Sequence, residues 1–189
     1  MPSNQPDTAA RRPERGRAVL LFGALLATAL TAGLEFAHVL EWAPKSTYSG
    51  RLYVQLQESL YVWFGTVGAA IYLLAVAATV ALAIALRAEP VARASLRVAA
   101  GLEVVALASF LAVIYPVNLR LPLHDGRVPG DWSQLRLRWE LGHTIGFVLF
   151  GLALVLLLGL VVGTSKLTRK QATARSDDPA HSDDRSRLV

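Results

Sequence analysis

The stretch LGHTIGFVLFGLALVLLLGLVVG, residues 141–163, contains no Asp, Glu, Lys or Arg. An α-helix rises about 1.5 Å per residue, so roughly 20 residues cross a hydrocarbon core about 30 Å thick. Three further apolar runs in this 189-residue chain are long enough to do the same, at 18–40, 62–86 and 98–117. The sequence therefore predicts an all-α, membrane-embedded, up-down four-helix bundle with helices at about 18–42, 53–86, 92–117 and 134–163.

The first apolar run shares two features with a secretory signal peptide. It follows a basic flank and contains a small-residue site at 27–29, Ala-Thr-Ala. The apolar region of a signal peptide typically spans about 7–15 residues, and this run continues well past that site. We therefore interpret it as a retained helix.

The two ends of the chain differ from the four-helix domain at 18–163. Residues 1–17 and 164–189 are rich in Ser, Asp, Arg and Pro, and they have too little apolar surface to form a core. We expect both ends to be disordered. The chain has no cysteine, which excludes disulfide and thiol chemistry, and nothing in it indicates a nucleic-acid partner.

Basic residues concentrate on one side of the predicted bundle. They are Arg11, Arg12, Arg15 and Arg17 before the first helix, Arg87, Arg93 and Arg97 between the second and third, and Lys166, Arg169, Lys170 and Arg175 after the fourth. Cytoplasmic segments of membrane proteins carry an excess of Lys and Arg. We therefore expect a multi-pass protein of the cell membrane with both termini in the cytoplasm.

Ionisable residues interrupt the end of the first helix. The stretch LEFAHVLEWAPK, residues 34–45, places Glu35, His38 and Glu41 at helical spacing. In an up-down bundle this segment meets the start of the second helix, the end of the third and the start of the fourth at the outer face. Ionisable residues inside a membrane are rare and usually face the bundle interior. We therefore expect a functional polar pocket at the outer end.

Two helices share the pattern Glu-x-x-His, at 35–38 and at 140–143. Di-iron carboxylate bundles use this spacing and add one Glu from each of the other two helices. The candidates are Glu58 and Glu103. Glu103, however, lies 15 residues before Asn118, or about 22 Å along a helix, which is far deeper than the other ligands.

A complete di-iron site is therefore not expected, and Glu103 is interpreted as a separate buried group, protonated or paired. A smaller site remains sterically feasible. No cofactor is indicated firmly, and a divalent metal is left as an alternative, with Glu35, His38, Glu58, Glu140 and His143 as its candidate ligands.

Several residues at the helix ends have simple structural interpretations. Tryptophans there are typical of the interfacial aromatic belt, and basic side chains are typical of anchors whose charged heads reach water. Arg136 and Glu140 have the spacing of a modest helix ion pair, and glycines 142 and 146 favour close helix packing. The residues of the belt are Trp42, Trp63, Trp132 and Trp139, and the anchors are Lys45, Arg136 and Arg138.

Four segments together resemble a four-helix integral membrane family of unknown function that includes the fungal anthrone oxygenases. They are GLEFAHVLEWAPK, YVQLQESLYVWFG, YPVN and DWSQLRLRWELGH, and the resemblance covers roughly residues 18–163. The family shares a Pro-x-Asn at the end of the third helix and a Trp-rich opening of the fourth that ends in His. In this sequence the matching residues are Pro116, Asn118, Trp132, Arg138, Trp139 and His143.

The resemblance implies an oxygenase that converts an anthrone to an anthraquinone without an evident organic cofactor. On that model His143 or His38 removes a proton from the acidic CH₂ group, and Glu140 or Glu35 orients the imidazole. The carbanion then reacts with O₂. The residues implied to line and bind an apolar aromatic substrate, which enters from the lipid, are Gln57, Tyr61, Trp63, Asn118, Trp139 and Arg138.

A second function class is a membrane protein without catalysis. Such a protein would bind a lipid, a quinone, a metal or a membrane partner through the same pocket. The sequence lacks the paired Gly/Pro-interrupted helices typical of inverted-repeat transporters. Membrane lipids and an apolar small molecule are therefore the expected partners in either class.

Overall fold

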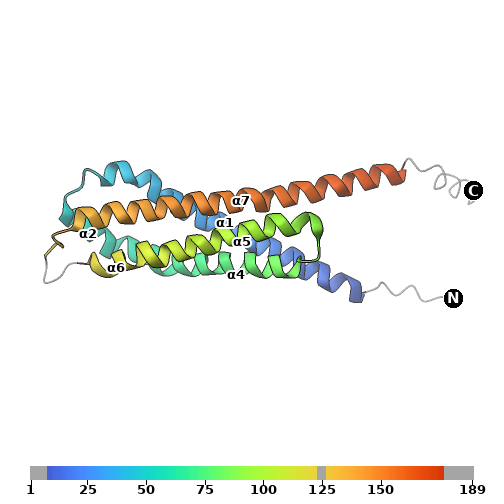
Figure 1. Ribbon diagram of the computed structural model, residues 1–189, viewed down its shortest axis with the longest axis horizontal. Helices are drawn as coiled ribbons and strands as arrows, with labels where there is room; N and C mark the ends of the chain where they lie inside the picture. The colour runs from blue at the N-terminus through green and yellow to red at the C-terminus, as the bar shows by residue number, and fades with distance from the viewer. Residues whose placement is uncertain (1–7, 123–126, 177–189) are drawn as a thin grey trace, which may run out of the picture.

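The computed structural model describes residues 8–122 and 127–176, and within them it is helical and contains no strand. Four helical stretches there are long and apolar enough to cross a membrane: Arg15–Lys45, Tyr61–Ala85, Ala92–Arg120 and Trp132–Gly163. The predicted all-α bundle of four long apolar helices is confirmed. Figure 1 shows these helices lying side by side in an elongated bundle.

The first and last helices are longer than predicted. Helix α1 spans Thr8–Lys45 and helix α7 spans Trp132–Ser176. Residues 8–17 and 164–176 are thus helical where the sequence predicted disorder, because adding residues to an existing helix costs far less than starting a new one. The rest of the predicted disordered ends, 1–7 and 177–189, lies outside the described residues.

The second predicted helix is broken into four elements. Helix α2 spans Gly50–Ser59 and begins at an N-cap, where Ser49 accepts a hydrogen bond from the amide of Leu52. It is followed by α3 at Tyr61–Trp63, the π-helical segment η1 at Phe64–Gly68 and helix α4 at Ala69–Ala85. Glycine weakens an α-helix, and η1 contains two glycines.

The third predicted helix is interrupted in the same way. Helix α5 spans Pro90–Ser109, the π-helical segment η2 spans Phe110–Ile114, and helix α6 spans Tyr115–Arg120. Proline has no amide hydrogen to donate four residues back. Pro116 therefore leaves the carbonyl of Ala112 without its α-helical partner, and the wider π-turns lie at that point.

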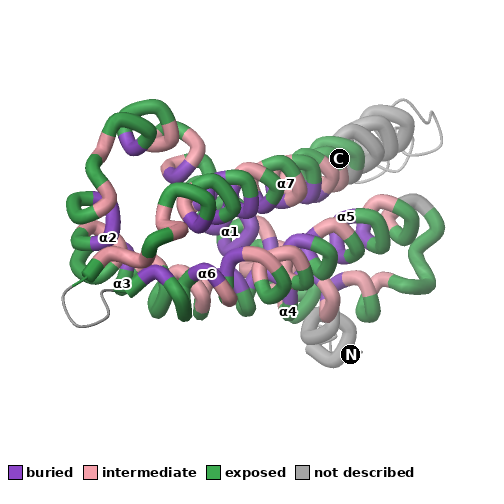
Figure 2. The backbone as a smooth tube through the Cα atoms, turned by 60° about the vertical axis from the view of Figure 1, so that its left-hand side comes forward, coloured by how far each residue is buried: buried purple, intermediate pink, exposed green. Residues whose placement is uncertain are grey.

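The four long helices pack around a core with α1 against α4 and α7, and with α5 against α7 and α4. Buried positions follow the inward faces of the helices (Figure 2). Large apolar side chains such as Leu74 and Val155 are exposed. An apolar outer surface is what a lipid-facing bundle requires. The end that carries α2 and α6 is called the site end below. The start of α1 and the end of α7 lie at the opposite end (Figure 1).

The core contains three layers of buried residues. The layer farthest from the site end is apolar and is called the apolar plug. It consists of Ala24, Leu82, Leu96, Ala99, Ala153 and Leu157. The middle layer is built around Tyr72 and Phe150, and the layer at the site end around Tyr53, Tyr61 and Trp139.

Candidate functional site

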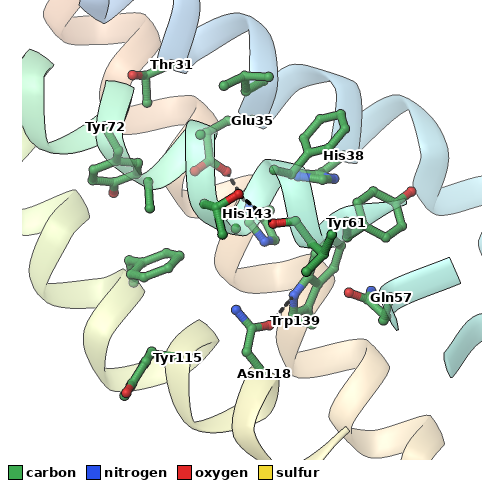
Figure 3. Close-up of a pocket in the computed structure, with 18 of the residues that line it drawn as sticks. Thr31, Glu35, His38, Gln57, Tyr61, Tyr72, Tyr115, Asn118, Trp139 and His143 are labelled. Carbon is green, nitrogen blue, oxygen red and sulfur yellow. Dashed lines mark hydrogen bonds and ion pairs between the residues drawn. The ribbon is translucent and has the colours of Figure 1, made fainter. Parts of the chain in front are cut away.

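A cavity of about 650 Å³ lies in the half of the bundle nearer the site end. Its wall receives side chains from all four membrane-length stretches, and Thr31 and Tyr72 lie toward one side of it while Gln57 lies toward the other (Figure 3). Most of the residues predicted from the sequence are in this wall. They are Glu35, His38, Gln57, Glu58, Tyr61, Asn118, Trp139 and His143.

Three predicted site residues do not line the cavity. Trp63 is 69% exposed and Arg138 is also exposed. Each successive residue is rotated by about 100° around a helix axis, so the inward-facing Tyr61 and Trp139 direct these two neighbours away from the cavity. Glu140 is buried, and its carboxyl group lies near the ammonium of Lys45. Trp63 and Arg138 thus lie outside the cavity wall, and their assignment to ligand binding stays a prediction.

Glu35 and His143 form a direct pair across two helices. Glu35 Oε2 lies 2.7 Å from His143 Nδ1, and both side chains are buried. The sequence analysis left open whether Glu140 or Glu35 orients the imidazole, and the structure pairs Glu35 of α1 with His143 of α7. Gly146 makes this possible, because a Cβ there would lie 2.8 Å from the carboxyl carbon of Glu35.

The other nitrogen of His143 is buried and makes no hydrogen bond to any of the described residues. This nitrogen is Nε2. A buried polar atom without a hydrogen bond is costly, and this one belongs to a residue in the cavity wall (Figure 3). His143 is thus an imidazole held at one nitrogen and unbonded at the other.

His38 lies beside His143 in an aromatic surround. The two imidazole centroids are 4.2 Å apart. The rings of Tyr61, Phe64 and Trp139 lie 5.3, 5.2 and 4.7 Å from His38. These aromatic walls exclude water from both imidazoles and offer flat surfaces to a ligand.

Asn118 fixes the indole in that wall. Trp139 Nε1 donates a 2.9 Å hydrogen bond to Asn118 Oδ1, which joins α7 to α6. A buried indole usually finds such a partner. The Pro-x-Asn and Arg-Trp-x-x-x-His patterns therefore meet in one contact at the cavity.

Lys45 is not the water-facing anchor that the sequence suggested. Its side chain is 2% exposed, and its Nζ lies 2.9 Å from Glu41 Oε2 and 3.6 Å from Glu140 Oε1. The ammonium also lies 4.3 Å from the ring centroid of Tyr61 and 4.5 Å from that of Trp139. Two carboxyl groups and two aromatic faces replace the water that a buried cation loses.

Arg136 does not form the predicted ion pair with Glu140. Its guanidinium donates hydrogen bonds to the backbone carbonyls of Lys45 and Ser46, at 3.0 and 3.2 Å. These bonds provide partners for carbonyl groups at the C-terminal end of α1. Glu140 therefore belongs to the Lys45 cluster. Of the four predicted catalytic residues, the structure brings together Glu35, His38 and His143.

The five candidate metal ligands are not arranged around one ion position among the described residues. Within residues 8–122 and 127–176, no three acidic or histidine side chains are arranged to hold one metal ion. The divalent-metal alternative stays a prediction.

Glu103 is a separate buried group, as its depth predicted. It is fully buried, does not line the cavity, and accepts a 2.7 Å hydrogen bond from Thr28 Oγ1. We expect Glu103→Gln to change ligand binding or any turnover by less than about twofold, because the amide oxygen can accept the same hydrogen bond. Steady-state rates with folding checked by size-exclusion chromatography test this, and a loss as large as that of His143→Ala would contradict it.

Gly146 offers a second test of the site. Gly146→Ala should displace the Glu35 carboxyl from His143 and lower turnover by about 10- to 100-fold, since a misplacement of about 1 Å has effects of this size. Stability should change by less than about 1 kcal/mol, because the displaced group is the end of a flexible side chain. Gly151→Ala is the matched control, since a Cβ there meets nothing within 4 Å. Equal rates for the two variants would contradict the Glu35–His143 assignment.

No protein-family model, curated protein or solved structure matches this chain. The resemblance to the anthrone oxygenases stays a prediction from the four sequence segments.

One face of α1 carries more buried polar residues than the sequence analysis identified. Thr28, Thr31, Glu35, His38 and Lys45 are all buried, at successive spacings of three, four, three and seven residues. Residues at this spacing share one helix face. That periodicity is present in the sequence, and it is the signal that indicates an inward-facing Lys45.

Proposed function

We propose that this chain is a multi-pass membrane oxygenase that binds an apolar aromatic, anthrone- or quinol-like molecule in its cavity. His143, oriented by Glu35, removes a proton from the bound molecule, which O₂ then oxidises. The observation that carries the proposal is the buried imidazole with a carboxyl group at Nδ1 and, among the described residues, an unbonded Nε2 in a wall of mainly aliphatic and aromatic side chains.

The pair has the arrangement expected of a general base. A carboxylate at Nδ1 selects the tautomer with its hydrogen there and leaves Nε2 free to accept a proton. The carboxylate also stabilises the imidazolium that forms. A positioned base of this kind typically contributes about 10²- to 10⁴-fold to a rate.

The reaction balances with O₂ as the oxidant. Heterolysis of a C–H bond gives the proton to His143 and leaves the electron pair on carbon. The carbanion adds O₂, and protonation gives a hydroperoxide on that carbon. Loss of the second C–H proton then breaks the O–O bond, forms the new C=O and releases water, so anthrone and O₂ give anthraquinone and H₂O.

Entry from the bilayer is supported by the cavity wall itself. Leu73, Leu111 and Tyr115 line the cavity and are 55%, 54% and 49% exposed on the outward faces of α4, η2 and α6. The cavity therefore opens on the apolar surface between the second and third membrane-length stretches. Segments η1 and η2 border this opening, and π-helical turns are frequent at functional sites.

We further propose that the site end faces outward and that both termini are cytoplasmic, on the distribution of Lys and Arg. Cysteines introduced as Ser46→Cys and Gly130→Cys should react with a membrane-impermeant maleimide in whole cells, and Ala88→Cys should not. The chain has no cysteine of its own, so labelling reports the introduced residue alone. Labelling of Ala88→Cys without the other two would reverse the orientation.

The activity is tested with purified protein in lipid nanodiscs supplied with anthrone. We expect consumption of one O₂ for each anthraquinone formed, at a rate above that of empty nanodiscs, and loss of that excess in His143→Ala. Equal rates with wild-type protein, His143→Ala and empty nanodiscs would contradict the proposal.

A binding function without catalysis is the competing proposal. The same lateral opening suits retention of a quinone or a lipid, and the candidate ligands of such a protein also include a metal or a membrane partner. Quinone recovered from purified protein by solvent extraction, together with absent O₂ consumption, would favour this alternative.

A further inference from the structure

Glu41 has no role in the mechanism above, yet it connects the buried histidines to the protein surface. Its Oε2 lies 3.6 Å from His38 Nδ1 and 2.9 Å from Lys45 Nζ, and the hydroxyl of Tyr61 donates a hydrogen bond to the same atom. The Glu41 side chain is 35% exposed. One carboxyl group therefore touches a site histidine and also reaches the surface of the site end.

Three of the four groups are buried, and the fourth, Glu41, is partly exposed. The side chains of Glu35, His143 and His38 are 6%, 9% and 4% exposed, in contrast to 35% for Glu41. The two imidazoles are in ring contact, with centroids 4.2 Å apart. The 3.6 Å separation between His38 and Glu41 exceeds a hydrogen bond, and a small rotation of the imidazole would shorten it to one.

A base that is buried away from water must lose its proton before it can act again. His143 is buried, and its ring contacts the rings of His38 and Trp139 (Figure 3). Its neighbour His38 can accept a proton at one nitrogen and release one from the other. The exit from His38 that the contacts provide is Glu41.

We propose that Glu41 is a proton-relay residue that exchanges protons between the histidine pair and the water at the site end. The proton removed from the ligand passes from His143 to His38, from His38 to the Glu41 carboxylate, and from the resulting carboxylic acid to water. Each step breaks one N–H or O–H bond and forms another, without a change of oxidation state. The inference rests on the proposed function, because it begins with the proton that His143 removes.

The neighbours of Glu41 suit this role. Lys45 and His38 face it from α1 and Tyr61 faces it from α3, while Glu140 of α7 shares the Lys45 ammonium. The ammonium and the phenol hold one carboxyl oxygen in place beside His38. Lys45 and Tyr61 are therefore positioning residues, and Glu41 is the group that gains and loses the proton.

The test is proton exchange under argon, which separates proton removal from oxidation. Anthrone is incubated in D₂O buffer with the full-length protein in nanodiscs, and deuterium entering its CH₂ group is followed by mass spectrometry. Wild-type protein should accelerate exchange above empty nanodiscs. Glu41→Gln should lower the acceleration at least about tenfold, because the removed proton returns to carbon before it can escape.

Rescue distinguishes a relay from a structural ion pair. Glu41→Asp should keep most of the acceleration, and added acetate or imidazole should restore Glu41→Ala in proportion to its concentration. The matched control is Glu89→Gln, which alters an exposed carboxyl group at the opposite end. Size-exclusion chromatography in detergent confirms that each variant is folded, and if one of Glu41→Gln and Glu41→Ala does not fold, the other carries the test.

The outcomes separate the two proposals. If His143→Ala abolishes exchange while Glu41→Gln matches Glu89→Gln, the relay is wrong and the proposed function stands. A loss in Glu41→Ala that neither acid nor imidazole restores would also overturn the relay. If wild-type protein gives no exchange above empty nanodiscs, the proposed function fails and the relay fails with it.

Discussion

Replacing His143 by Ala is expected to lower anthrone oxidation by about 10²- to 10⁴-fold, the contribution of a positioned general base. The physical reason is the loss of the imidazole nitrogen that, among the described residues, lies in the cavity wall without a hydrogen bond. His38→Ala should also cause a large loss, because the two rings are in contact and His38 passes on the proton. The measurement is the initial rate of O₂ consumption in nanodiscs.

The double variant is the decisive part of this experiment. Residues that act as one unit are strongly non-additive when removed, so His38→Ala/His143→Ala should be little slower than either single variant. His181→Ala, in the C-terminal tail outside the described residues, is the control for changing a histidine as such. Mild and additive losses in folded protein would mean that the two histidines act independently.

Replacing Lys45 by Met is expected to destabilise the protein by about 3–5 kcal/mol, the usual result of removing one partner from a buried ion pair. Lys45 is 2% exposed, and Glu140 beside it is equally buried. Without the ammonium, the Glu140 carboxyl group is left in an apolar layer with Tyr61 and Trp139. The measurement is the free energy of unfolding in detergent by denaturant titration.

Two further variants define the origin of this effect. Lys45→Met/Glu140→Gln should recover part of the lost stability, because the second substitution removes the unpaired charge. Arg138→Met, which changes an exposed basic residue on the same turn of α7 as Glu140, should alter stability by less than about 0.5 kcal/mol. Equal small losses for Lys45→Met and Arg138→Met would show that Lys45 reaches water after all.

Hydropathy and helical period predicted the fold because both depend on local sequence. The four apolar stretches are long enough to cross the hydrocarbon core of a bilayer. The interruption of the third helix has a local cause as well, in Pro116. The break in the second helix was missed, because glycines in a membrane helix more often indicate close packing than a change of helix type.

The sequence predicted most of the residues of the candidate site, but it did not predict which of them contact one another. The Glu-x-x-His spacing placed Glu35 and His143 near the same end, but their contact depends on the rotation of α1 and α7 and on the space left by Gly146. The prediction for Lys45 was wrong for a related reason. The sequence does not show whether a lysine at a helix end points to water or into the bundle. The inward orientation of Lys45 depends on the position of Trp139 on another helix.

The apolar plug has a consequence for the direction of exchange. It closes the bundle on the side away from the site end with small and aliphatic side chains, and a closely packed layer of this kind blocks passage along the bundle axis. A ligand drawn from the leaflet at the site end must return its product to that same leaflet. Ligand placed in the opposite leaflet would then reach the cavity only after it crosses the bilayer by itself. In vesicles loaded with ligand in that leaflet, the ligand would be consumed at the rate of its spontaneous flip-flop.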